Sequence, residues 1–387
     1  MAGVPAEIQK LYDTFQPKAK DILSAQRIVN EGAVKIIEKD KAKDCTMYLL
    51  DNAAFLVNSQ NEIQVHISLK QNLTFPEQEG ALFCIKTPKK SMSFEAASEE
   101  EKKEWINAFL YTLDGLVLPV FKEIDGNTVW DPIGSLTERE RNIFEEFKTT
   151  FSQQQIPDEE GYCDDAMFIK YLRARSWDIQ KSLQMLKDTL EWRKTYKPQE
   201  TTIEDIAEEH KTGWVYSGTG KDKLGRPLVY CRAHFDVRPH SPAKVRHLVK
   251  ILEDSIKLCN SKETGVEKIV WLVDLGGPKE AKLSEIKDGV KTAIEVVNIF
   301  QAHYPERLGR AFMIDAPTAF EFGWRMVSPF IDPITQRRFI FVKRKKNIAE
   351  MLDFFESEQL EEQFGGSNTF KFDYEAWKAE KLAQTNE

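Results

Sequence analysis

Residues 27–114 alternate between short apolar stretches and polar turns. Many short strands at this spacing predict an antiparallel barrel or sandwich. The run ends in a helix at 98–110, which starts at a capping box of Ser98 and Glu101 and carries a central Trp105. Residues 1–26 predict a short amphipathic helix. The expected strands are 32–37, 46–50, 53–57, 64–69, 81–85 and 90–94.

The second part of the chain has a different pattern. Helical periodicity at 136–147 and 164–196 is followed by strands that alternate with helices, which predicts a largely parallel sheet with helical crossovers. These strands are 228–230, 268–274, 310–315 and 337–342, and the helices are 243–260, 281–302 and 319–330.

The patterns divide the chain into six segments of different character. The stretch 115–135 is rich in glycine and proline and predicts a linker. The expected segments are an N-terminal helix (1–26), an all-β unit (27–114), a linker (115–135), a helical lobe (136–200), an α/β unit (201–370) and a C-terminal tail (371–387).

Composition narrows the class of protein. A net charge of -8 argues against nucleic acid as a general partner, although a local basic patch can still meet anionic lipid. Five scattered cysteines without a CxxC pair predict reduced thiols and no zinc site. The first residues lack the apolar stretch of a signal peptide, and no apolar run reaches bilayer length. We therefore expect a cytoplasmic protein that meets membranes peripherally.

Five phrases in the second part resemble the CRAL-TRIO family, which includes phosphatidylinositol-transfer proteins and tocopherol- and retinal-binding proteins. The resemblance spans about residues 136–370 and implies a helical lobe before an α/β domain that encloses one lipid molecule. The phrases are Phe168–Asp178, Asp222–Tyr230, His303–Arg310, Phe330–Thr335 and Leu360–Gly366.

Residues 27–114 resemble a pleckstrin-homology domain of the kind found beside Rho exchange-factor domains. The order of strands and helix carries this resemblance, together with the phrases 27–34 and 47–57. Phosphoinositide-binding members place an arginine near the first hairpin, where this chain has Cys45. A structural or protein-binding role is therefore favoured for this module.

The CRAL-TRIO resemblance also implies a headgroup site. In the phosphatidylinositol-binding branch of the family, the residues that contact the headgroup correspond to Arg175, Thr335 and Arg338 of this chain. The guanidinium fork of an arginine suits a pair of phosphate oxygens. Alternatives are a surface salt bridge of Arg175 with Asp178 or Asp188 and a solvated strand end for Arg338. Ser176 replaces a further basic residue of the branch.

The strand 268–273 lacks the small polar residues of the transfer proteins, which puts phosphatidylcholine in doubt as a second ligand. Another apolar molecule could take its place. Trp271 is expected in the cavity wall, with ordinary core packing as the alternative.

The apolar segment 320–331 is, in the family, the gate over the lipid cavity. Glu295 is either a helix carboxylate that pairs with cations on the gate side or an exposed helix residue, whereas Glu306 and Arg307 look structural. The basic run 343–346 predicts docking to an anionic leaflet or, alternatively, a solvated loop. The gate residues are Phe322, Trp324, Met326 and Phe330, and the basic residues are Lys343, Arg344, Lys345 and Lys346.

The chain has no Walker loop, HExxH or Gly-x-Ser-x-Gly motif, which predicts a protein that is not an enzyme and that holds a bound phospholipid rather than a cofactor or metal. The leading hypothesis is binding of phosphatidylinositol and its exchange between membranes, or its presentation to a lipid kinase. The alternative is a membrane-recruited adaptor that senses lipid and binds or regulates small GTPases.

Overall fold

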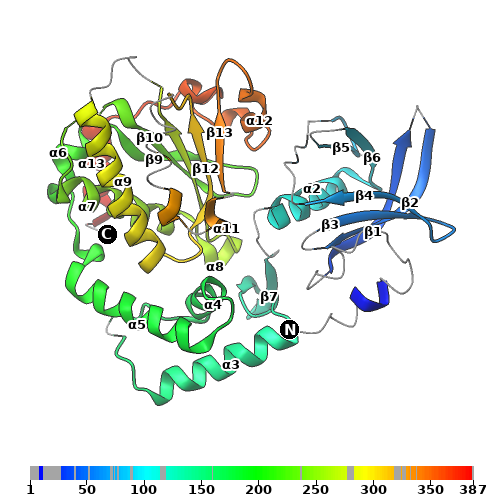
Figure 1. Ribbon diagram of the computed structural model, residues 1–387, viewed down its shortest axis with the longest axis horizontal. Coiled ribbons are helices and arrows are strands. Elements are labelled where there is room, and N and C mark those ends of the chain that lie inside the picture. Colours follow the sequence, from blue (N-terminus) through cyan, green and yellow to red (C-terminus); the bar gives the residue numbers. More distant parts are fainter. Residues whose placement is uncertain are drawn as a thin grey trace. The chain divides into compact units, whose positions relative to one another are not determined.

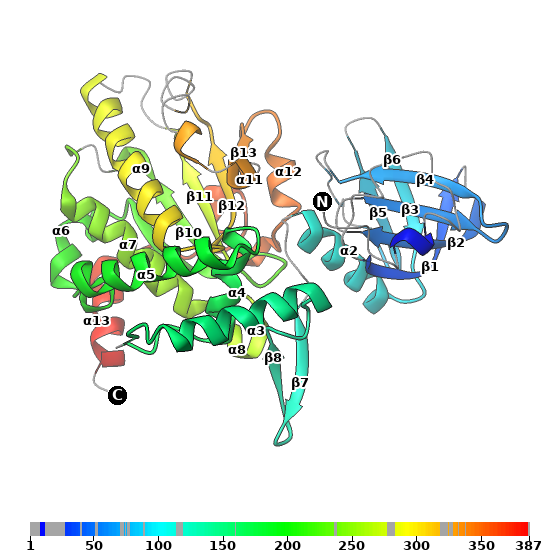
Figure 2. The same ribbon diagram turned by 60° about the horizontal axis from the view of Figure 1, so that its bottom comes forward.

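The structure is a computed structural model in which the chain forms two compact units, residues 1–118 and 119–387. Figures 1 and 2 show their elements from two directions. The residues described are 8–11, 28–38, 41–50, 53–69, 73, 75, 78–87, 90–113, 119–158, 160–235, 238–276, 283–317, 324, 328–331, 333–336 and 338–385.

The first unit is a curled six-stranded antiparallel sheet with one helix packed against it (Figure 2). The strand order is β4-β3-β2-β1-β6-β5, and the curled all-β unit that the sequence predicts, with a helix at its C-terminal end, is confirmed. The elements are β1 (Ile28–Glu38), β2 (Lys41–Leu50), β3 (Ala53–Asn58), β4 (Ile63–Ser68), β5 (Leu82–Lys86), β6 (Ser91–Glu95) and α2 (Glu99–Leu113).

Helix α2 closes the first unit through Trp105, which is buried on the sheet. A Cβ atom on Gly32 of β1 would lie 3.3 Å from the Trp105 ring, so the absence of a side chain there permits this approach. The helix begins where Ser98 accepts a hydrogen bond from the Glu101 amide (3.2 Å). Glu101 in turn accepts from the Ala97 amide (2.9 Å), one residue before the position that the expected capping box would use. Of the expected N-terminal helix, residues 8–11 are described and helical.

The second unit begins with a β-hairpin in the stretch expected to be a linker. Strands β7 (Val120–Ile124) and β8 (Asn127–Asp131) join through Asp125 and Gly126, which have φ angles of 51° and 79°. Positive φ at both central positions is the requirement of a type I′ hairpin turn. The hairpin packs on Gly265, where a Cβ atom would lie 2.5 Å from Pro119.

Three helices form the lobe that follows: α3 (Glu138–Gln153), α4 (Asp165–Ala174) and α5 (Ile179–Tyr196). Each begins at a side-chain cap, and the caps are Thr137, Asp164 and Asp178. The lobe has its own apolar core, centred on the buried aromatic residues Phe144, Phe147, Phe168 and Tyr171.

The five-stranded sheet of the second unit has the order β13-β12-β11-β10-β9, with β9 antiparallel and the others parallel. The largely parallel sheet is therefore confirmed. One face packs against α7 and α9. The strands are β9 (Val215–Lys221), β10 (Pro227–Arg232), β11 (Ile269–Asp274), β12 (Leu308–Ile314) and β13 (Phe339–Val342); the helices are α6 (Ala207–His210), α7 (Pro242–Leu258), α8 (Ser261–Thr264), α9 (Leu283–His303), α11 (Pro333–Gln336), α12 (Ile348–Leu352) and α13 (Tyr374–Thr385).

Strand β9 was not expected from the sequence because glycines interrupt its pattern. A Cβ atom on Gly218 would lie 2.2 Å from the Tyr230 ring, and one on Gly220 would lie 1.8 Å from the carbonyl oxygen of Gln359. The two glycines thus let a buried ring and a backbone segment pass close to the strand.

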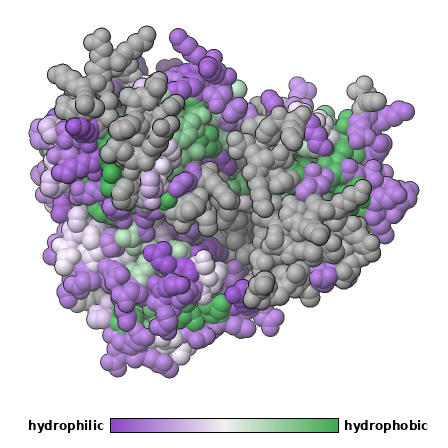
Figure 3. Space-filling model, in the orientation of Figure 1, coloured by the Kyte–Doolittle hydropathy of each residue, from purple (hydrophilic) through white to green (hydrophobic). Residues whose placement is uncertain are grey.

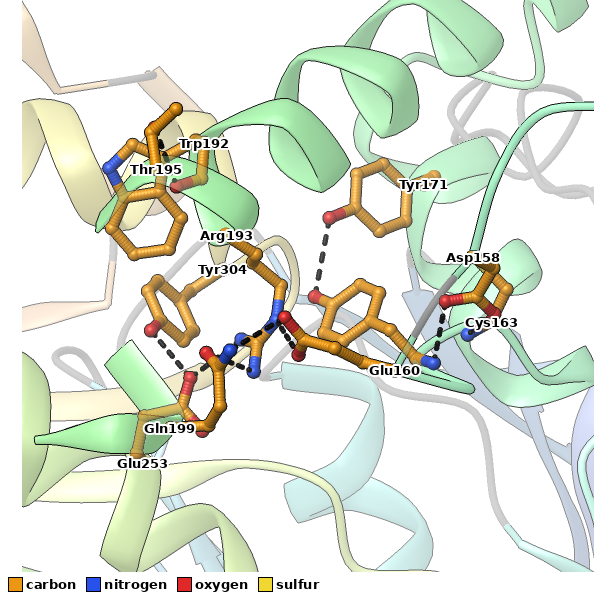
Figure 4. Close-up of polar contacts among 11 residues, drawn as sticks. Asp158, Glu160, Cys163, Tyr171, Trp192, Arg193, Thr195, Gln199, Glu253 and Tyr304 are labelled. Carbon is orange, nitrogen blue, oxygen red and sulfur yellow. Dashed lines mark hydrogen bonds and ion pairs between the residues drawn. The ribbon is translucent and has the colours of Figure 1, made fainter. Parts of the chain in front are cut away.

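A buried ionic network ties the lobe to the sheet (Figure 4). Arg193 of α5 lies between Glu160 (Nε to Oε2, 3.0 Å) and Glu253 of α7 (Nη1 to Oε1, 2.8 Å). The Tyr304 hydroxyl, which follows α9, donates to the same Glu253 oxygen at 2.6 Å. The network therefore joins four segments that are distant in sequence: Arg193 binds Glu160 and Glu253, and Glu253 binds Tyr304. Burial raises the pKa of Tyr304.

The buried pair His210–His247 is expected to make the fold sensitive to acid. The Trp214 indole donates to His247 Nδ1 (3.1 Å), so His247 Nε2–H donates to His210 Nδ1 (2.8 Å) and both rings are neutral. Burial lowers the pKa of His210 to about 3 and that of His247 well below its usual value. Unfolded histidines titrate near about 6.5, so the unfolded chain binds more protons below that pH.

The free energy of unfolding should therefore fall as the pH drops below about 6.5, with a slope of about 1.4 kcal/mol per pH unit for each of the two histidines. Urea denaturation at about pH 7 and about pH 5 measures this loss. A His247→Gln variant should lose less over the same interval. An equal loss in both proteins would assign the acid sensitivity to other groups.

All five cysteines are free thiols, and four of them are buried. Within the described ranges, no helix is long and apolar enough to cross a membrane. Among the same residues, no group of three His, Cys, Asp or Glu side chains is arranged to hold a metal ion.

Candidate functional site

Three charged residues meet at the edge of the sheet where its parallel strands begin. Lys268, Glu306 and Arg338 precede β11, β12 and β13, and the amino ends of neighbouring parallel strands lie together. Lys268 Nζ contacts Glu306 Oε2, while Arg338 approaches the same oxygen at 3.7 Å and donates to the Leu308 carbonyl at 2.7 Å. We call these three residues the amino-edge cluster.

The amino-edge cluster carries more positive than negative charge in a buried place. Burial alone would raise the pKa of the Glu306 carboxyl, but Lys268, Arg338 and Arg173 together lower it to about 2. Burial lowers the pKa of Lys268 to about 8, and the charges of Arg338 and Arg173 act in the same direction. Lys268 and Arg338 are only 5% and 8% exposed. An anion would be favoured beside such a group.

A second ion pair lies directly beside the cluster in sequence. Glu267 contacts the buried Lys170 of α4, and Arg307 donates to the Glu267 carbonyl at 3.1 Å. The backbone joins the two pairs, because the Ile269 amide donates to the Arg307 carbonyl at 2.9 Å. This second pair fixes α4, which carries Arg173, against the edge of the sheet.

The headgroup residues expected from the sequence lie at different places. Thr335 is in α11, and its carbonyl accepts from the Arg338 amide at 3.0 Å, so these two are close. Arg175 ends α4 and donates to the Ala174 carbonyl at 3.1 Å. Arg173, two residues earlier, is the arginine of this phrase whose charge acts on Glu306.

The alternative partners of Arg175 have contacts of their own. Asp178 caps α5 and pairs with Lys181 at 2.9 Å, and Asp188 accepts from Gln184 at 2.8 Å. Ser176 is exposed and has a φ angle of 52°.

The strands that follow the amino-edge cluster, β11, β12 and β13, share an apolar face. Trp271, Ala311 and Phe339 are in register across β11, β12 and β13, and Val273, Met313 and Phe341 form the next row. Trp271 packs on Phe300 of α9, with 6.0 Å between ring centroids. Trp271, Val273 and Phe339 are only partly buried, and Phe341 is 43% exposed. Figure 3 shows apolar residues reaching the surface over β12 and β13.

The opposite face of β12 is ordinary core. Phe312 packs between Phe354 and Phe355, each with 5.6 Å between ring centroids. Together with Ile314 it is fully buried there.

Most of the expected gate lies outside the described residues, including Phe322 and Met326. Phe330 belongs to the 3₁₀ turn Ser328–Phe330, but its side chain is not described. Trp324 lies over β13, with its ring 5.0 Å from Phe339 and 5.3 Å from Phe341.

Glu295 of α9 pairs with His240, with 3.2 Å between its Oε2 and the ring Nε2. His240 lies two residues before the start of α7, and the Glu295 side chain is 46% exposed.

At the opposite edge, where the strands end, Arg344 is held by two carboxylates. Its guanidinium lies 2.9 Å from Asp274, the last residue of β11, and 2.7 Å from Asp315, the first residue after β12. Lys343 Nζ contacts the Ala316 carbonyl. Lys345 and Lys346 are exposed. In the basic run, Lys343 and Arg344 thus contact the protein itself, and Lys343, Lys345 and Lys346 are exposed.

Sequence reasoning missed Lys268 and assigned Glu306 only a structural role. The available signal was positional: Lys268 directly precedes β11 and Glu306 lies two residues before β12, so in a parallel sheet both had to lie at one edge. Glu306 also has a left-handed backbone with φ 60°, a conformation that non-glycine residues adopt mainly where surrounding contacts enforce it.

Comparison with known families gives two matches. Residues 143–188 match the CRAL/TRIO, N-terminal domain, and residues 211–366 match the CRAL/TRIO domain. A CRAL-TRIO domain-containing protein of Schizosaccharomyces pombe is 35% identical over 210 residues, covering 54% of this chain and 19% of that protein. Phosphatidylinositol transfer protein PDR17 of Saccharomyces cerevisiae is 31% identical over 221 residues, covering 54% of this chain and 59% of that protein.

Patellin-6 of Arabidopsis thaliana is 28% identical over 213 residues, covering 52% of this chain and 51% of that protein. The chain therefore spans less than two thirds of the length of these relatives. Among solved structures, Sfh5 is similar over 68% of this chain and all of its own, with 16% identity and a TM-score of 0.46. The Vav1 exchange factor is similar over 28% of this chain and 31% of its own, with 16% identity and a TM-score of 0.25.

Proposed function

The chain carries a CRAL/TRIO domain with its N-terminal lobe, and from this premise we propose that it encloses one phospholipid, phosphatidylinositol, and exchanges it with membranes or presents it for phosphoinositide signalling. The relative PDR17 is named a phosphatidylinositol transfer protein, which supports the choice of ligand.

The observation that carries the proposal is the pairing of two unlike surfaces on β11, β12 and β13. A half-buried apolar face, with Trp271 and Phe339, lies on strands whose starting edge holds buried cations. A ligand that uses both must be apolar along most of its length and anionic at one end. A phospholipid has this form.

The apolar face accounts for extraction of the lipid from a bilayer. Leaving the bilayer forfeits about 0.8 kcal/mol for each buried CH₂ group. A protein therefore needs a dry apolar wall of similar extent, and the partly buried rings of Trp271, Phe300 and Phe339 are suited to supply part of it.

The amino-edge cluster supports an anionic headgroup. The two positive charges of Arg338 and Lys268 exceed the single negative charge of Glu306, and the charge of Arg173 adds to the positive potential. A phosphate oxygen would accept charge-assisted hydrogen bonds from these donors. We propose that Thr335 and Arg338 contact the headgroup, as the family resemblance implies, and that Arg175 lies at the outer side of the same site.

Exposed basic residues support docking to a membrane. Lys345 and Lys346 are exposed, and they follow edge strand β13, on which Phe341 is exposed as well. Each basic residue near an anionic leaflet contributes about 1 kcal/mol.

Native mass spectrometry of protein purified from a eukaryotic host tests the proposal, because a bound phosphatidylinositol should be detected. Transfer of fluorescent phosphatidylinositol between vesicles tests exchange. Repeated absence of any lipid would exclude the proposal. Undetectable transfer together with co-purification of a small GTPase would favour the adaptor function instead.

A double variant, Arg338→Ala with Thr335→Ala, is expected to abolish loading of phosphatidylinositol. A hydrogen bond to a charged group contributes about 1.5–3 kcal/mol, so losing two donors should weaken binding at least about a hundredfold. Because Arg338 also donates to the Leu308 carbonyl, we expect stability to fall by about 1–3 kcal/mol as well.

Lipid loading measured by mass spectrometry under conditions where urea denaturation finds the variant folded separates the two effects. Arg338→Lys is the matched control, since it keeps the charge but not the fork, and it should load partially. Full loading of the double variant would show that the headgroup binds at another place.

A further inference from the structure

The edge of the sheet where the strands end carries a clamp between two loops. It consists of Asp274, Asp315 and Ala316 on one side and Lys343 and Arg344 on the other. The Arg344 guanidinium spans Asp274 Oδ2 (2.9 Å) and Asp315 Oδ2 (2.7 Å), and its backbone amide donates to Asp315 Oδ1 (2.9 Å). Lys343 Nζ donates to the Ala316 carbonyl. We call this set the carboxyl-edge clamp.

The clamp holds the chain at the point where it leaves β12. Asp315 has a left-handed backbone with φ 50°, which an aspartate adopts only when contacts around it favour it. Its amide donates to the Val342 carbonyl at 2.8 Å, and its carboxylate carries both contacts to Arg344. Removing Arg344 from Asp315 would release this residue and the Ala316–Pro317 stretch that follows it.

The cations of the clamp lie where a membrane could reach them. The Arg344 side chain is 33% exposed, and its neighbours Lys345 and Lys346 face solvent. A phosphodiester presents the same pair of acceptor oxygens to a guanidinium as a carboxylate does. The phosphate and carboxylate of a lipid with net negative charge can therefore replace Asp274 and Asp315 as partners of Arg344 once Lys345 and Lys346 have brought the loop to an anionic leaflet. The phosphate of phosphatidylcholine is neutralised by its own choline and competes poorly with two carboxylates.

The position of the clamp links it to the apolar face. Phe341, 43% exposed, comes two residues before Lys343 on β13, and Met313 is its register neighbour on β12, two residues before Asp315. The clamp thus joins the ends of the two strands that border the exposed part of this face. Opening it would loosen that border and change the access of a lipid.

We propose that the carboxyl-edge clamp is a sensor of anionic membrane surfaces: lipid phosphates take Lys343 and Arg344 from Ala316, Asp315 and Asp274, and the released strand ends admit lipid exchange. This inference rests on the proposed function, because exchange is its readout. Lys345 and Lys346 have a separate role, which is to bind the vesicle.

The test measures exchange of fluorescent phosphatidylinositol at increasing vesicle concentration, with phosphatidylcholine vesicles that contain or lack phosphatidylserine. The maximal rate per protein at saturating vesicles reports the exchange step, and the half-saturating vesicle concentration reports binding to the membrane. For the wild type, we expect the maximal rate to rise about thirtyfold with phosphatidylserine. This is the change that Lys343 and Arg344 would give if each contributes about 1 kcal/mol at an anionic surface.

The variant Asp274→Asn with Asp315→Asn keeps hydrogen-bond acceptors but removes the charges that hold Arg344. Its maximal rate on pure phosphatidylcholine vesicles should approach the wild-type rate on anionic vesicles. Glu350→Gln, an exposed carboxylate on α12 that hydrogen-bonds Asn347 (3.3 Å), is the matched control and should behave as the wild type. Lys345→Ala with Lys346→Ala should raise the half-saturating concentration and leave the maximal rate unchanged.

Two results would overturn the clamp while leaving the proposed function intact. One is a wild-type maximal rate that ignores phosphatidylserine. The other is an Asn variant that stays slow on neutral vesicles. An acceleration that inorganic phosphate alone reproduces on neutral vesicles would also exclude a membrane surface as the trigger. Absence of any exchange by the wild type would instead reject the proposed function.

A second measurement needs no variant and so does not depend on the folding of the Asn protein. Hydrogen exchange of wild-type amides in residues 311–317 should become several-fold faster with anionic vesicles than with neutral ones. Unchanged or slower exchange there would contradict opening of the clamp.

Discussion

Glu306→Gln is expected to lower the free energy of unfolding by about 3–5 kcal/mol. Glu306 is the carboxylate that Lys268 contacts and that Arg338 approaches, and both cations are almost fully buried. Removing one member of a buried pair leaves its partner charged without compensation, which costs far more than the pair itself contributes. Glutamine keeps the size and a hydrogen-bond acceptor, so the loss measures charge rather than packing.

Urea denaturation at neutral pH measures the effect, with Glu200→Gln as the matched control. Glu200 pairs with Lys197 at 3.0 Å on the surface, where both side chains are more than half exposed. An exposed pair contributes about 0–1 kcal/mol, so the control should lose little. Equal losses for the two variants would show that Glu306 does not act as the counter-charge of a buried cluster.

Arg193→Leu is the second change with a large expected effect, again about 3–5 kcal/mol in the free energy of unfolding. Without the guanidinium, Glu160 and Glu253 lose their common partner, and Glu253 keeps only the Tyr304 hydroxyl among the contacts of this network. Arg193 also lies over the Tyr162 ring at 4.6 Å, a contact that leucine replaces only in part. The lobe should loosen from the sheet.

The control for Arg193 lies on the same helix. Lys181 pairs with Asp178 at 2.9 Å but is 72% exposed, so Lys181→Leu should cost less than about 1 kcal/mol. Adding Glu253→Gln to Arg193→Leu should restore part of the stability, because the second substitution removes an unpaired charge. A double variant with a lower free energy of unfolding than Arg193→Leu alone would contradict this account.

Local pattern was sufficient for most of the fold. The strands of the first unit alternate because one face is buried, and the helices of the second unit begin at recognisable caps such as Asp164 and Asp178. The β7–β8 hairpin could also have been predicted, since Asp125-Gly126 is the residue pair that type I′ turns favour. It was interpreted as a linker because nearby glycines and prolines dominated the pattern.

Strand β9 and the ionic networks could not be found this way. Gly218 and Gly220 are explained by Tyr230 and Gln359, which approach from elsewhere in the chain. Arg193 is 60 residues from Glu253, and nothing near either residue indicates the other. Pattern reports which side of an element is buried, whereas the partner of a buried charge depends on the packing of distant elements.

The amino-edge cluster lies between these cases. Because the strands are parallel, as the sequence predicted, Lys268 and Glu306 lie at one edge of the sheet. Their mutual contact and the field of Arg173 depend on α4, whose position the Lys170–Glu267 pair fixes. The family resemblance indicated Thr335 and Arg338 but gave no reason to include Lys268.

Two buried thiols, Cys231 and Cys259, can report how often the main sheet separates from the helix that covers it. Burial raises the pKa of Cys231 on β10 to about 12 and that of Cys259, which follows α7, to about 11. Since thiolate is the reactive form, a labelling reagent should modify either sulfur only during moments when the sheet and α7 separate. The labelling rate of the native protein would then count these separations directly, without an introduced probe.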